Sequence, residues 1–337
     1  MQSILVLGGT NFIGRNLVEE LLVKGNFDIT LFNRQQTNAE LFSKINNIKG
    51  DRESDDIIQL SKRSWDCVID LSCYYSENFE ALLHLLEGHI KKYIFISSTS
   101  AYRLSEDSLN NIITEDFETL PYGELEKANG TMETYGNRKA ECERILLKTK
   151  WLDKIILRPS IVYGKYDSTD RLYYWLYRIK KKLTFILPNN GADKITLTYV
   201  NDLVKIIIKS IELKNHSTIY NATTHCPLSL KEILESACKT NTIINLSSKS
   251  LLDNNIKPEF DIPLWFNSSL MFDNNKLAND FQIELKLYYH SMRETMNYFD
   301  SLNWPIPKAG LDIKTEKELI EKTMTTNKGL DAMLSDE

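Results

Sequence analysis

Two hydrophobic periods alternate along the first half of the chain. Ile4–Leu7 is a short run of consecutive apolar residues, which is typical of a strand buried on both faces. Further strands are predicted at 29–32, 67–69, 93–96 and 155–157, with a shorter one at 47–50. Apolar residues at helical spacing predict helices over 12–24, 79–86 and 134–147. Strands that alternate with helices imply right-handed crossovers and a parallel sheet with both faces covered. The pattern therefore predicts an α/β fold with a doubly wound parallel sheet.

The pattern is less regular after Arg158-Pro159. It predicts helices over 172–179, 203–211 and 230–237, a strand over 195–199, a loop over 253–263, and a helix followed by a tail over 314–337. No internal repeat and no low-complexity segment interrupts the chain.

Composition narrows the classes of partner. The chain has 337 residues, of which 42% are hydrophobic and 26% charged, as in an ordinary globular protein. Its 41 Lys and Arg against 46 Asp and Glu give a net charge of −5, which gives no reason to expect nucleic acid or an anionic membrane as a partner. No apolar run approaches the roughly 18 residues of a membrane-spanning helix, and we see no signal peptide. We therefore expect a cytoplasmic protein.

The cysteines and histidines suggest no disulfide framework and no metal. The five cysteines are odd in number and contain no Cys-x-x-Cys pair, so we interpret them as reduced core thiols. They are Cys67, Cys73, Cys142, Cys226 and Cys238. The five histidines are scattered along the chain.

A glycine-rich turn joins the first predicted strand to the first predicted helix. Glycine lets the backbone approach a pyrophosphate closely, and the helix N-terminus offers free N–H groups and a favourable dipole. A tight strand-to-helix turn needs glycine in any case, but the strand before it and the helix after it favour a dinucleotide site. The residues that we assign to this site are Gly8, Gly9, Thr10, Asn11, Phe12, Ile13 and Gly14.

The ends of the second and third strands indicate which dinucleotide binds. An NAD site usually has an acidic residue after the second strand, whereas this chain has Asn33-Arg34. A guanidinium can hold a 2′-phosphate with two hydrogen bonds, so we expect NADP, with NAD as the second choice; the alternative is a solvated arginine. Asp51 could accept from an adenine amino group or cap a helix. We also assign Arg52 and Leu71 to the cofactor site.

Tyr135 and Lys139 lie four residues apart in a predicted helix and therefore on one face. A nearby ammonium favours a phenolate, as a general acid/base for a carbonyl–alcohol pair requires. A Tyr-x-x-x-Lys spacing by itself belongs more often to two surface residues than to a catalytic pair. The cluster Ser97-Ser98-Thr99 follows a predicted parallel strand, where a hydroxyl can point into the cofactor crevice. A helix cap or a loop is the alternative reading of that cluster.

Together these motifs resemble the extended short-chain dehydrogenase/reductase superfamily. The matching segments are Gly8–Gly14, the serine cluster that ends in Tyr102, Tyr135-x-x-x-Lys139, Arg158-Pro-Ser-Ile-Val-Tyr-Gly164 and Val200-Asn201-Asp202. More narrowly, the chain is similar to the NAD(P)-dependent epimerase/dehydratase group that acts on sugar nucleotides.

The resemblance implies a Rossmann domain over 1–158, to which segments around 195–222 return. It also implies a smaller α/β substrate-binding domain over 159–312, and it leaves 313–337 as a C-terminal helix and tail. Members of the superfamily often pair through two helices per subunit, so the resemblance also implies a homodimer.

The resemblance also implies roles for individual residues. Ser98, four positions before Tyr102, would hydrogen-bond the substrate oxygen, Tyr135 would be the acid/base, and Lys139 would hold the nicotinamide ribose. Ser97 would contact the cofactor, and Thr99 and Tyr102 would contact the substrate. Sugar 4,6-dehydratases of the family carry an Asp-Glu pair where this chain has Thr99-Ser100, so dehydratase chemistry is not expected.

The second half of the chain should select the substrate. Arg171 could clamp a diphosphate or be a surface charge at a helix start. Arg178 and Lys180–Lys182 form a basic run that we interpret as a solvated helix end, with phosphate contact as the alternative. The aromatic cluster 173–177 is expected to pack in a core, and Asp202 either caps a helix or lies near the functional side of the fold.

The function that these expectations favour is an NADP-dependent reductase or epimerase acting on a nucleotide-linked sugar, a small-molecule substrate. One alternative is reduction of a carbonyl compound that is not a nucleotide sugar. The other is a catalytically silent relative that binds a dinucleotide or RNA.

Overall fold

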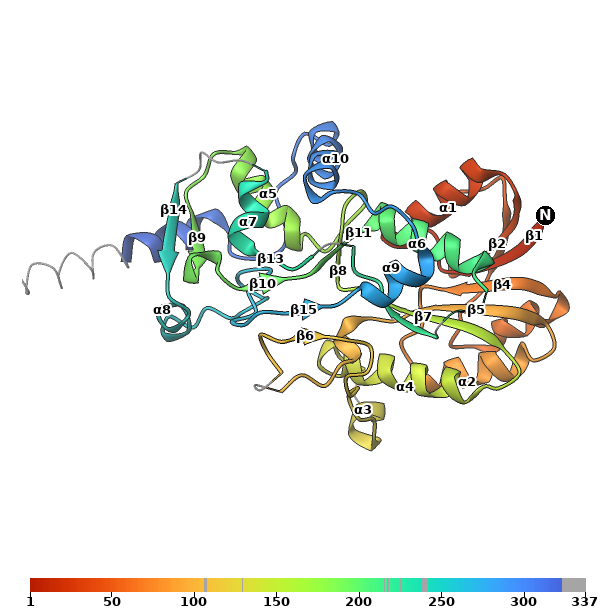
Figure 1. The fold of residues 1–337 in the computed structure, drawn as a ribbon. Coiled ribbons are helices and arrows are strands. Elements are labelled where there is room, and N and C mark those ends of the chain that lie inside the picture. The colour runs from red at the N-terminus through yellow and green to blue at the C-terminus, as the bar shows by residue number, and fades with distance from the viewer. Residues whose placement is uncertain are drawn as a thin grey trace, which may run out of the picture. The chain divides into compact units, whose positions relative to one another are not determined.

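The computed structural model describes residues 1–105, 108–128, 130–214, 216, 218–224, 226–237 and 242–322. The chain divides into two compact units (Figure 1). Unit 1 consists of Met1–Ser168, Thr196–Cys226 and Met271–Leu287, and unit 2 consists of Thr169–Ile195, Pro227–Leu270 and the chain from Tyr288 onward. Unit 1 is thus built from three separate segments of the sequence.

Unit 1 contains a seven-stranded sheet in the order β12-β7-β5-β4-β1-β2-β3, in which every pair is parallel. The strands are β1 (Gln2–Leu7), β2 (Phe27–Asn33), β3 (Asn46–Lys49), β4 (Trp65–Asp70), β5 (Ile90–Ile96), β7 (Asp153–Arg158) and β12 (Ile219–Asn221). The predicted parallel α/β fold is confirmed. The sequence did not predict β12, because its three residues include no apolar run.

Helices cover both faces of this sheet (Figure 1). On one face lie α1 (Phe12–Lys24) and α6 (Val200–Glu212), and on the other lie α2 (Ser76–Leu85) and α4 (Tyr135–Lys148). Leu5 and Leu7 of β1 are buried in one apolar cluster with Phe79 of α2 and Leu146 of α4. The continuous apolar runs of the strands are explained by this burial on both faces.

Smaller elements complete unit 1. Two further helices, α3 (Glu124–Ala128) and α9 (Asn275–Phe281), belong to it. Two short parallel strand pairs join β8 (Ile161–Tyr163) with β11 (Leu197–Tyr199), and β6 (Ile112–Ile113) with β15 (Met271–Phe272). The single strand predicted over 195–199 is divided in the structure: Leu197–Tyr199 form β11, whereas Ile195 lies in a separate strand. Residues 194–195 form β10, which pairs with β13 (Leu228–Ser229) of unit 2 instead.

Unit 2 is built around α5 (Arg171–Lys180), which is buried over most of its length. Its other helices are α7 (Leu230–Glu235), α8 (Ser248–Asp253), α10 (Tyr288–Ser301) and a helix over 313–322, and its second strand pair is β9 (Phe185–Pro188) with β14 (Ile243–Leu246). The predicted loop over 253–263 follows α8. Of the segment predicted over 314–337, the part after 322 lies outside the described residues.

Two predictions about the side chains of α5 have different outcomes. Tyr173, Tyr174, Trp175 and Tyr177 are all buried, so the expectation of core packing is confirmed. The interpretation of Arg178 as part of a solvated helix end is wrong: its Nε lies 2.8 Å from a carboxylate oxygen of Glu316, and both side chains are buried. A guanidinium that is paired in this way is not available to bind phosphate.

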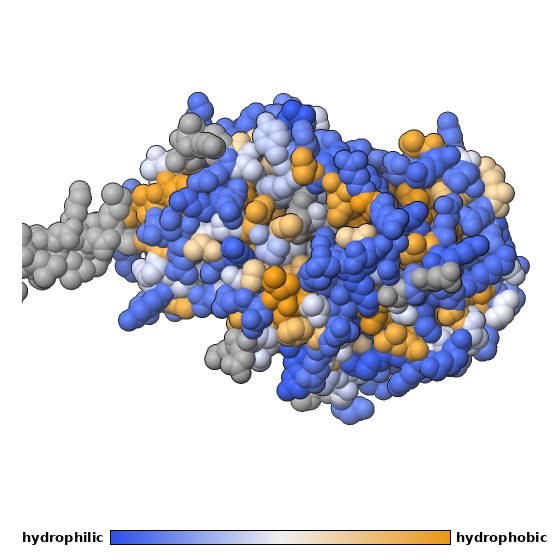
Figure 2. All heavy atoms as spheres, in the orientation of Figure 1, coloured by the Kyte–Doolittle hydropathy of each residue, from blue (hydrophilic) through white to orange (hydrophobic). Residues whose placement is uncertain are grey.

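The described cysteines are not all in the core. Cys67, Cys73 and Cys142 are buried, but Cys226 is exposed, which corrects the prediction for that residue. Cys238 lies outside the described residues. In the face shown in Figure 2, hydrophilic residues predominate and apolar residues gather in separate patches. Among the described residues, no helix combines the length and apolar character needed to cross a membrane.

Candidate functional site

The turn between β1 and α1 forms an open backbone cradle. Gly8 and Gly9 adopt φ angles of +108° and +103°, which side chains other than glycine rarely tolerate. A Cβ on Gly14 would lie 2.7 Å from the Cα of Gly9, so α1 begins directly against the turn. Asn11 caps α1 by accepting a hydrogen bond from the N–H of Phe12. The free N–H groups of a helix N-terminus beside such a turn suit the pyrophosphate of a dinucleotide.

Asn33 and Arg34 at the end of β2 have different surroundings. The Asn33 side chain donates to the carbonyl of Gly8 and accepts from the N–H of Gln35, so its polar atoms fix the β2 loop against the glycine turn. The Arg34 side chain is 61% exposed, and its Nη1 lies 4.0 Å from a carboxylate oxygen of Asp51, whose side chain is 39% exposed. Arg34 therefore keeps donors that can reach a ligand from solvent.

Arg52 is held inside the protein by Asp70, the last residue of β4. Its Nη1 and Nη2 donate to the two carboxylate oxygens of Asp70 at 2.8 and 3.1 Å. Asp70 also accepts from the hydroxyl of Tyr93 and the N–H of Ser72. Burial acts to raise the pKa of Asp70, but Arg52 and these donors hold it below its usual value. The structure thus brings Arg52 to this end of the sheet with its charge already paired.

Lys139 is fixed at the carboxyl end of β5. Its buried ammonium donates a 2.8 Å hydrogen bond to the carbonyl of Ile96, the last residue of that strand. The same nitrogen lies 5.9 Å from the ring centre of Tyr135, at the start of α4. Burial acts to lower the pKa of Lys139, but the phenols and thiols around it, Tyr135 first among them, raise it above its ordinary value. Lys139 is therefore an ammonium at neutral pH.

Gly136 brings the start of α4 into contact with the turn after β5. A Cβ on Gly136 would lie 2.1 Å from the carbonyl oxygen of Ser100, so only glycine allows this approach. Ser98 caps the same turn, and its Oγ accepts from the N–H of Ser100 at 3.1 Å. Ser98, Tyr135 and Lys139, the three residues that the sequence singled out for catalysis, are thus brought together at the end of β5.

The other predicted residues of the serine cluster are engaged within the protein. Ser97 is buried, and its hydroxyl donates to Glu143, which also pairs with Arg158 at 2.5 Å. Tyr102 is buried and its hydroxyl donates to Asn221, while burial raises its pKa to about 12. Thr99 is buried as well. The hydroxyls of Ser97 and Tyr102 therefore stabilise the wall behind the site.

The loop between β4 and α2 adds a residue that the sequence analysis missed. Tyr74 is 45% exposed, and its ring centre lies 6.1 Å from that of Tyr135. The ammonium of Lys139 lies 5.3 Å from the Tyr74 ring centre. The next residue, Tyr75, packs against the guanidinium of Arg138. Two consecutive tyrosines after a buried strand were the available signal for this aromatic wall.

Arg171 and Asp202 lie elsewhere in the chain. Arg171 begins α5 in unit 2, and its side chain donates to the hydroxyl of Thr169. Burial raises the pKa of Glu259, and the positive charge of Arg171 acts against this rise. Asp202 of α6 is fully buried and accepts from the ammonium of Lys205 and the N–H of Lys286. Asp202 therefore ties α6 to the segment after α9.

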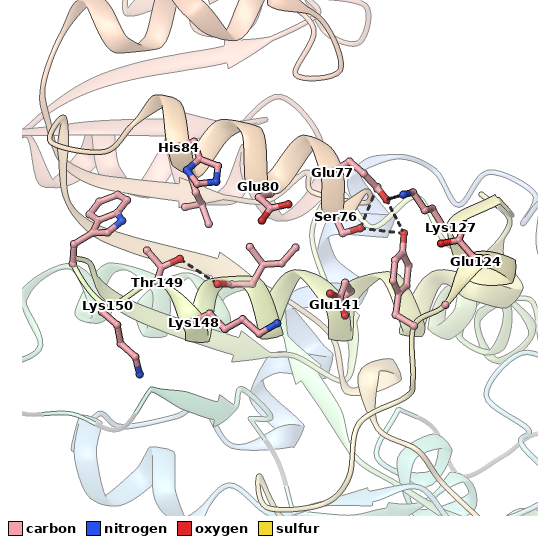
Figure 3. A pocket seen from close by; sticks show the side chains of 15 residues that line it. Ser76, Glu77, Glu80, His84, Glu124, Lys127, Glu141, Lys148, Thr149 and Lys150 are labelled. Carbon is pink, nitrogen blue, oxygen red and sulfur yellow. Dashed lines mark hydrogen bonds and ion pairs between the residues drawn. The ribbon is translucent and has the colours of Figure 1, made fainter.

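A groove between α2 and α4 is separate from these residues (Figure 3). It has a volume of about 560 Å³ and is lined by charges of both signs, including Glu77, Glu80, Glu141, Lys127 and Lys148. Its lining contains neither the glycine turn nor Ser98, Tyr135 or Lys139. The catalytic candidates thus lie outside this groove.

Comparison with known proteins finds a matching family model and several similar proteins. Residues 4–223 match the profile of a family described as the NAD dependent epimerase/dehydratase family. The chain is 29% identical over 217 residues to the chloroplast stem-loop binding protein of 41 kDa b of Arabidopsis thaliana; the match covers 60% of this chain and 53% of that protein. It therefore spans about half the length of that relative.

Two further comparisons involve sugar-nucleotide epimerases. The chain is 24% identical over 236 residues to UDP-glucose 4-epimerase of Vibrio cholerae, and the match covers 63% of this chain and 67% of that protein. The structure of UDP-glucuronic acid 4-epimerase from Bacillus cereus in complex with NAD superimposes with a TM-score of 0.67 at 18% identity, over 89% of this chain and 99% of that one. At this identity the likeness shows a common fold.

Proposed function

Because the chain belongs to the NAD dependent epimerase/dehydratase family, we propose that it is an NADP-dependent reductase or epimerase of a nucleotide-linked sugar. The observation that carries the proposal is the gathering of Ser98, Tyr135 and Lys139 at the carboxyl end of β5. In a parallel α/β sheet, ligands bind at the carboxyl ends of the strands. The glycine turn after β1 lies at the same edge of the sheet.

The residues around the glycine turn fit a dinucleotide. Gly8–Gly14 would hold its pyrophosphate, Arg34 a 2′-phosphate, and Lys139 its nicotinamide ribose. The positive φ angles of Gly8 and Gly9 leave the backbone open to a close approach. Bound NADP would supply a hydride donor or acceptor.

Tyr135 is the proposed acid/base. In the reductive direction the carbonyl oxygen of the substrate takes the phenolic proton as its carbon gains hydrogen, and in the oxidative direction the phenolate takes the hydroxyl proton back. The buried ammonium of Lys139 lies 5.9 Å from the ring centre of Tyr135, so a positive charge stands beside the proposed acid/base. The hydroxyl of Ser98 would donate to the same substrate oxygen. Thr99 and Ser100 cannot act as carboxylic acids, so the proposal includes no loss of water.

The cofactor preference is tested by replacing Arg34. We expect Arg34→Ala to weaken NADPH binding by about 10- to 100-fold, because a charge-assisted contact contributes about 1.5–3 kcal/mol, and to leave NADH binding unchanged. Calorimetric titration with both cofactors measures the effect. Arg103→Ala is the matched control, since the Arg103 side chain is 59% exposed in the same unit and pairs with Glu118. Tighter binding of NADH than NADPH by the unaltered protein would contradict the NADP assignment.

The substrate class is tested with a panel of nucleotide-linked sugars and their keto derivatives. We expect either NADPH consumption with a keto-sugar nucleotide, which indicates a reductase, or interconversion of two sugars without net consumption, which indicates an epimerase. The similarity to UDP-glucose 4-epimerase supports this class. Turnover only with carbonyl compounds that lack a nucleotide would favour the alternative reductase.

RNA binding is the second candidate, because the Arabidopsis relative is named a stem-loop binding protein. The net charge of −5 and the presence of both Tyr135 and Lys139 favour the enzymatic function. Salt-dependent retention of a stem-loop RNA on a filter, without turnover of any sugar nucleotide, would reverse that choice.

A further inference from the structure

Two buried thiols meet beneath the catalytic residues. The sulfur atoms of Cys73 and Cys142 are 3.6 Å apart, and both side chains are fully buried. Cys73 lies in the short loop between β4 and α2, and Cys142 lies in α4, three residues after Lys139. The pair therefore links the loop that carries Tyr74 to the helix that carries Tyr135.

The surroundings of Cys73 favour its thiolate. Burial acts to raise the pKa of Cys73, but the hydrogen bond with Cys142 and the charges of Arg52 and Lys139 lower it below its ordinary value. The same hydrogen bond raises the pKa of Cys142. A thiolate is the nucleophilic form of cysteine, so Cys73 is the attacking thiol of the pair.

We propose that Cys73 and Cys142 are an oxidisable dithiol that a hydroperoxide converts into a disulfide. The thiolate of Cys73 attacks one peroxide oxygen, breaks the O–O bond and becomes a sulfenic acid, while the other oxygen leaves as water or alcohol. The sulfur of Cys142 then attacks Cys73, forms the S–S bond and releases water. The two thiols lose two electrons and two protons, and the peroxide gains them.

The geometry requires a small movement of the loop. The sulfur atoms must approach from 3.6 Å to about 2.05 Å, the length of a disulfide bond. Cys142 is fixed within a packed helix, whereas Cys73 is flanked by half-buried Ser72 and by Tyr74, which is 45% exposed. The proposal therefore requires the loop to move, both to close the distance between the sulfur atoms and to open the fully buried Cys73 to an oxidant.

Movement of this loop would reach both parts of the proposed cofactor site. A Cβ on Gly8 would lie 3.6 Å from Leu71 and 3.8 Å from Ser72, so these two residues wall the glycine turn. Tyr74 packs against Tyr135 on the other side. We therefore expect the disulfide to weaken NADPH binding by about tenfold or more, as small misplacements of a binding site do. This expectation rests on the proposed function, whereas the disulfide itself does not.

The disulfide is tested by treating the folded protein with hydrogen peroxide, unfolding it in an alkylating reagent and mapping the peptides. We expect a peptide pair linked through Cys73 and Cys142, two hydrogens lighter than the separate peptides, that dithiothreitol cleaves. Cys67→Ser and Cys226→Ser should retain the link, since Cys67 is buried and Cys226 exposed outside the pair. Cys73→Ser and Cys142→Ser should lose it.

The result that overturns the proposal needs no variant. If peroxide oxidises Cys226 while Cys73 and Cys142 are both fully alkylated after unfolding, no disulfide has formed and the proposal is wrong. Oxidation of Cys73 to a sulfinic acid without a link to Cys142 would contradict it equally.

The coupling to the cofactor site is measured by NADPH titration of reduced and oxidised protein. Weaker binding after oxidation that dithiothreitol restores, together with no effect of peroxide on Cys142→Ser, supports the coupling. Equal binding by the reduced and the disulfide-linked protein overturns it. If the reduced protein binds no NADPH, the proposed function fails, and the peptide map still decides the disulfide.

Discussion

Replacement of Tyr135 by phenylalanine is expected to lower turnover by roughly 10²- to 10⁴-fold, the usual contribution of a positioned acid/base. The variant loses only the phenolic oxygen and its proton. Its ring can still pack against Tyr74 and lie beside the ammonium of Lys139. We therefore expect NADPH binding and the thermal unfolding midpoint to stay unchanged. The measurement is kcat with whichever sugar nucleotide the panel identifies.

Tyr289→Phe provides the matched control, because Tyr289 is 57% exposed and lies in unit 2. It removes the same hydroxyl from a tyrosine that has no proposed role, so its turnover should equal that of the unaltered protein. If Tyr135→Phe retained full turnover, the proton would come from another group and the mechanism proposed here would be wrong. A loss of NADPH binding in that variant would mean that the phenol holds the cofactor instead.

The sequence predicted the parts of the site that depend on spacing within one element. The four-residue spacing of Tyr135 and Lys139 places them on one helix face, and Gly8–Gly14 stand between an apolar run and a helical period. Each of these signals is local. Contacts between segments that are distant in the sequence were not predictable, because hydrophobic periodicity reports only the local structure of each segment. The approach of Gly136 to Ser100 and the pairing of Arg52 with Asp70 are of this kind.

Arg178 shows the same limit in unit 2. Its neighbours at 180–182 are lysines, so the local pattern resembles a solvated helix end. Its burial depends on Glu316, 138 residues later, which supplies the opposite charge. The short strands of unit 2 were also missed, since strands of two to four residues are too short to display alternation. In unit 1 the apolar runs alternate with segments of helical period, and this alternation carried a stronger signal.

Glu143→Ala is expected to destabilise the protein by about 3–5 kcal/mol, a cost typical of removing one partner of a buried ion pair. Glu143 accepts from the guanidinium of Arg158 at 2.5 and 2.9 Å and from the hydroxyl of Ser97 at 2.5 Å. All three side chains are buried, so the variant leaves a charge and a hydroxyl without this acceptor. Since folded domains are stable by about 5–15 kcal/mol, the loss is a large fraction of the total. Urea unfolding measures it.

Glu118→Ala is the control for this prediction, because Glu118 pairs with Arg103 at the surface, where the two side chains are 70% and 59% exposed. An exposed pair of this kind contributes about 0–1 kcal/mol. Glu143→Gln retains an acceptor for Ser97 and for one N–H of Arg158 but removes the charge, so its stability should lie between those of Glu143→Ala and the unaltered protein. If Glu143→Ala were no more destabilising than Glu118→Ala, the buried pair of Glu143 and Arg158 would contribute no more to stability than the exposed one, and the prediction would be wrong.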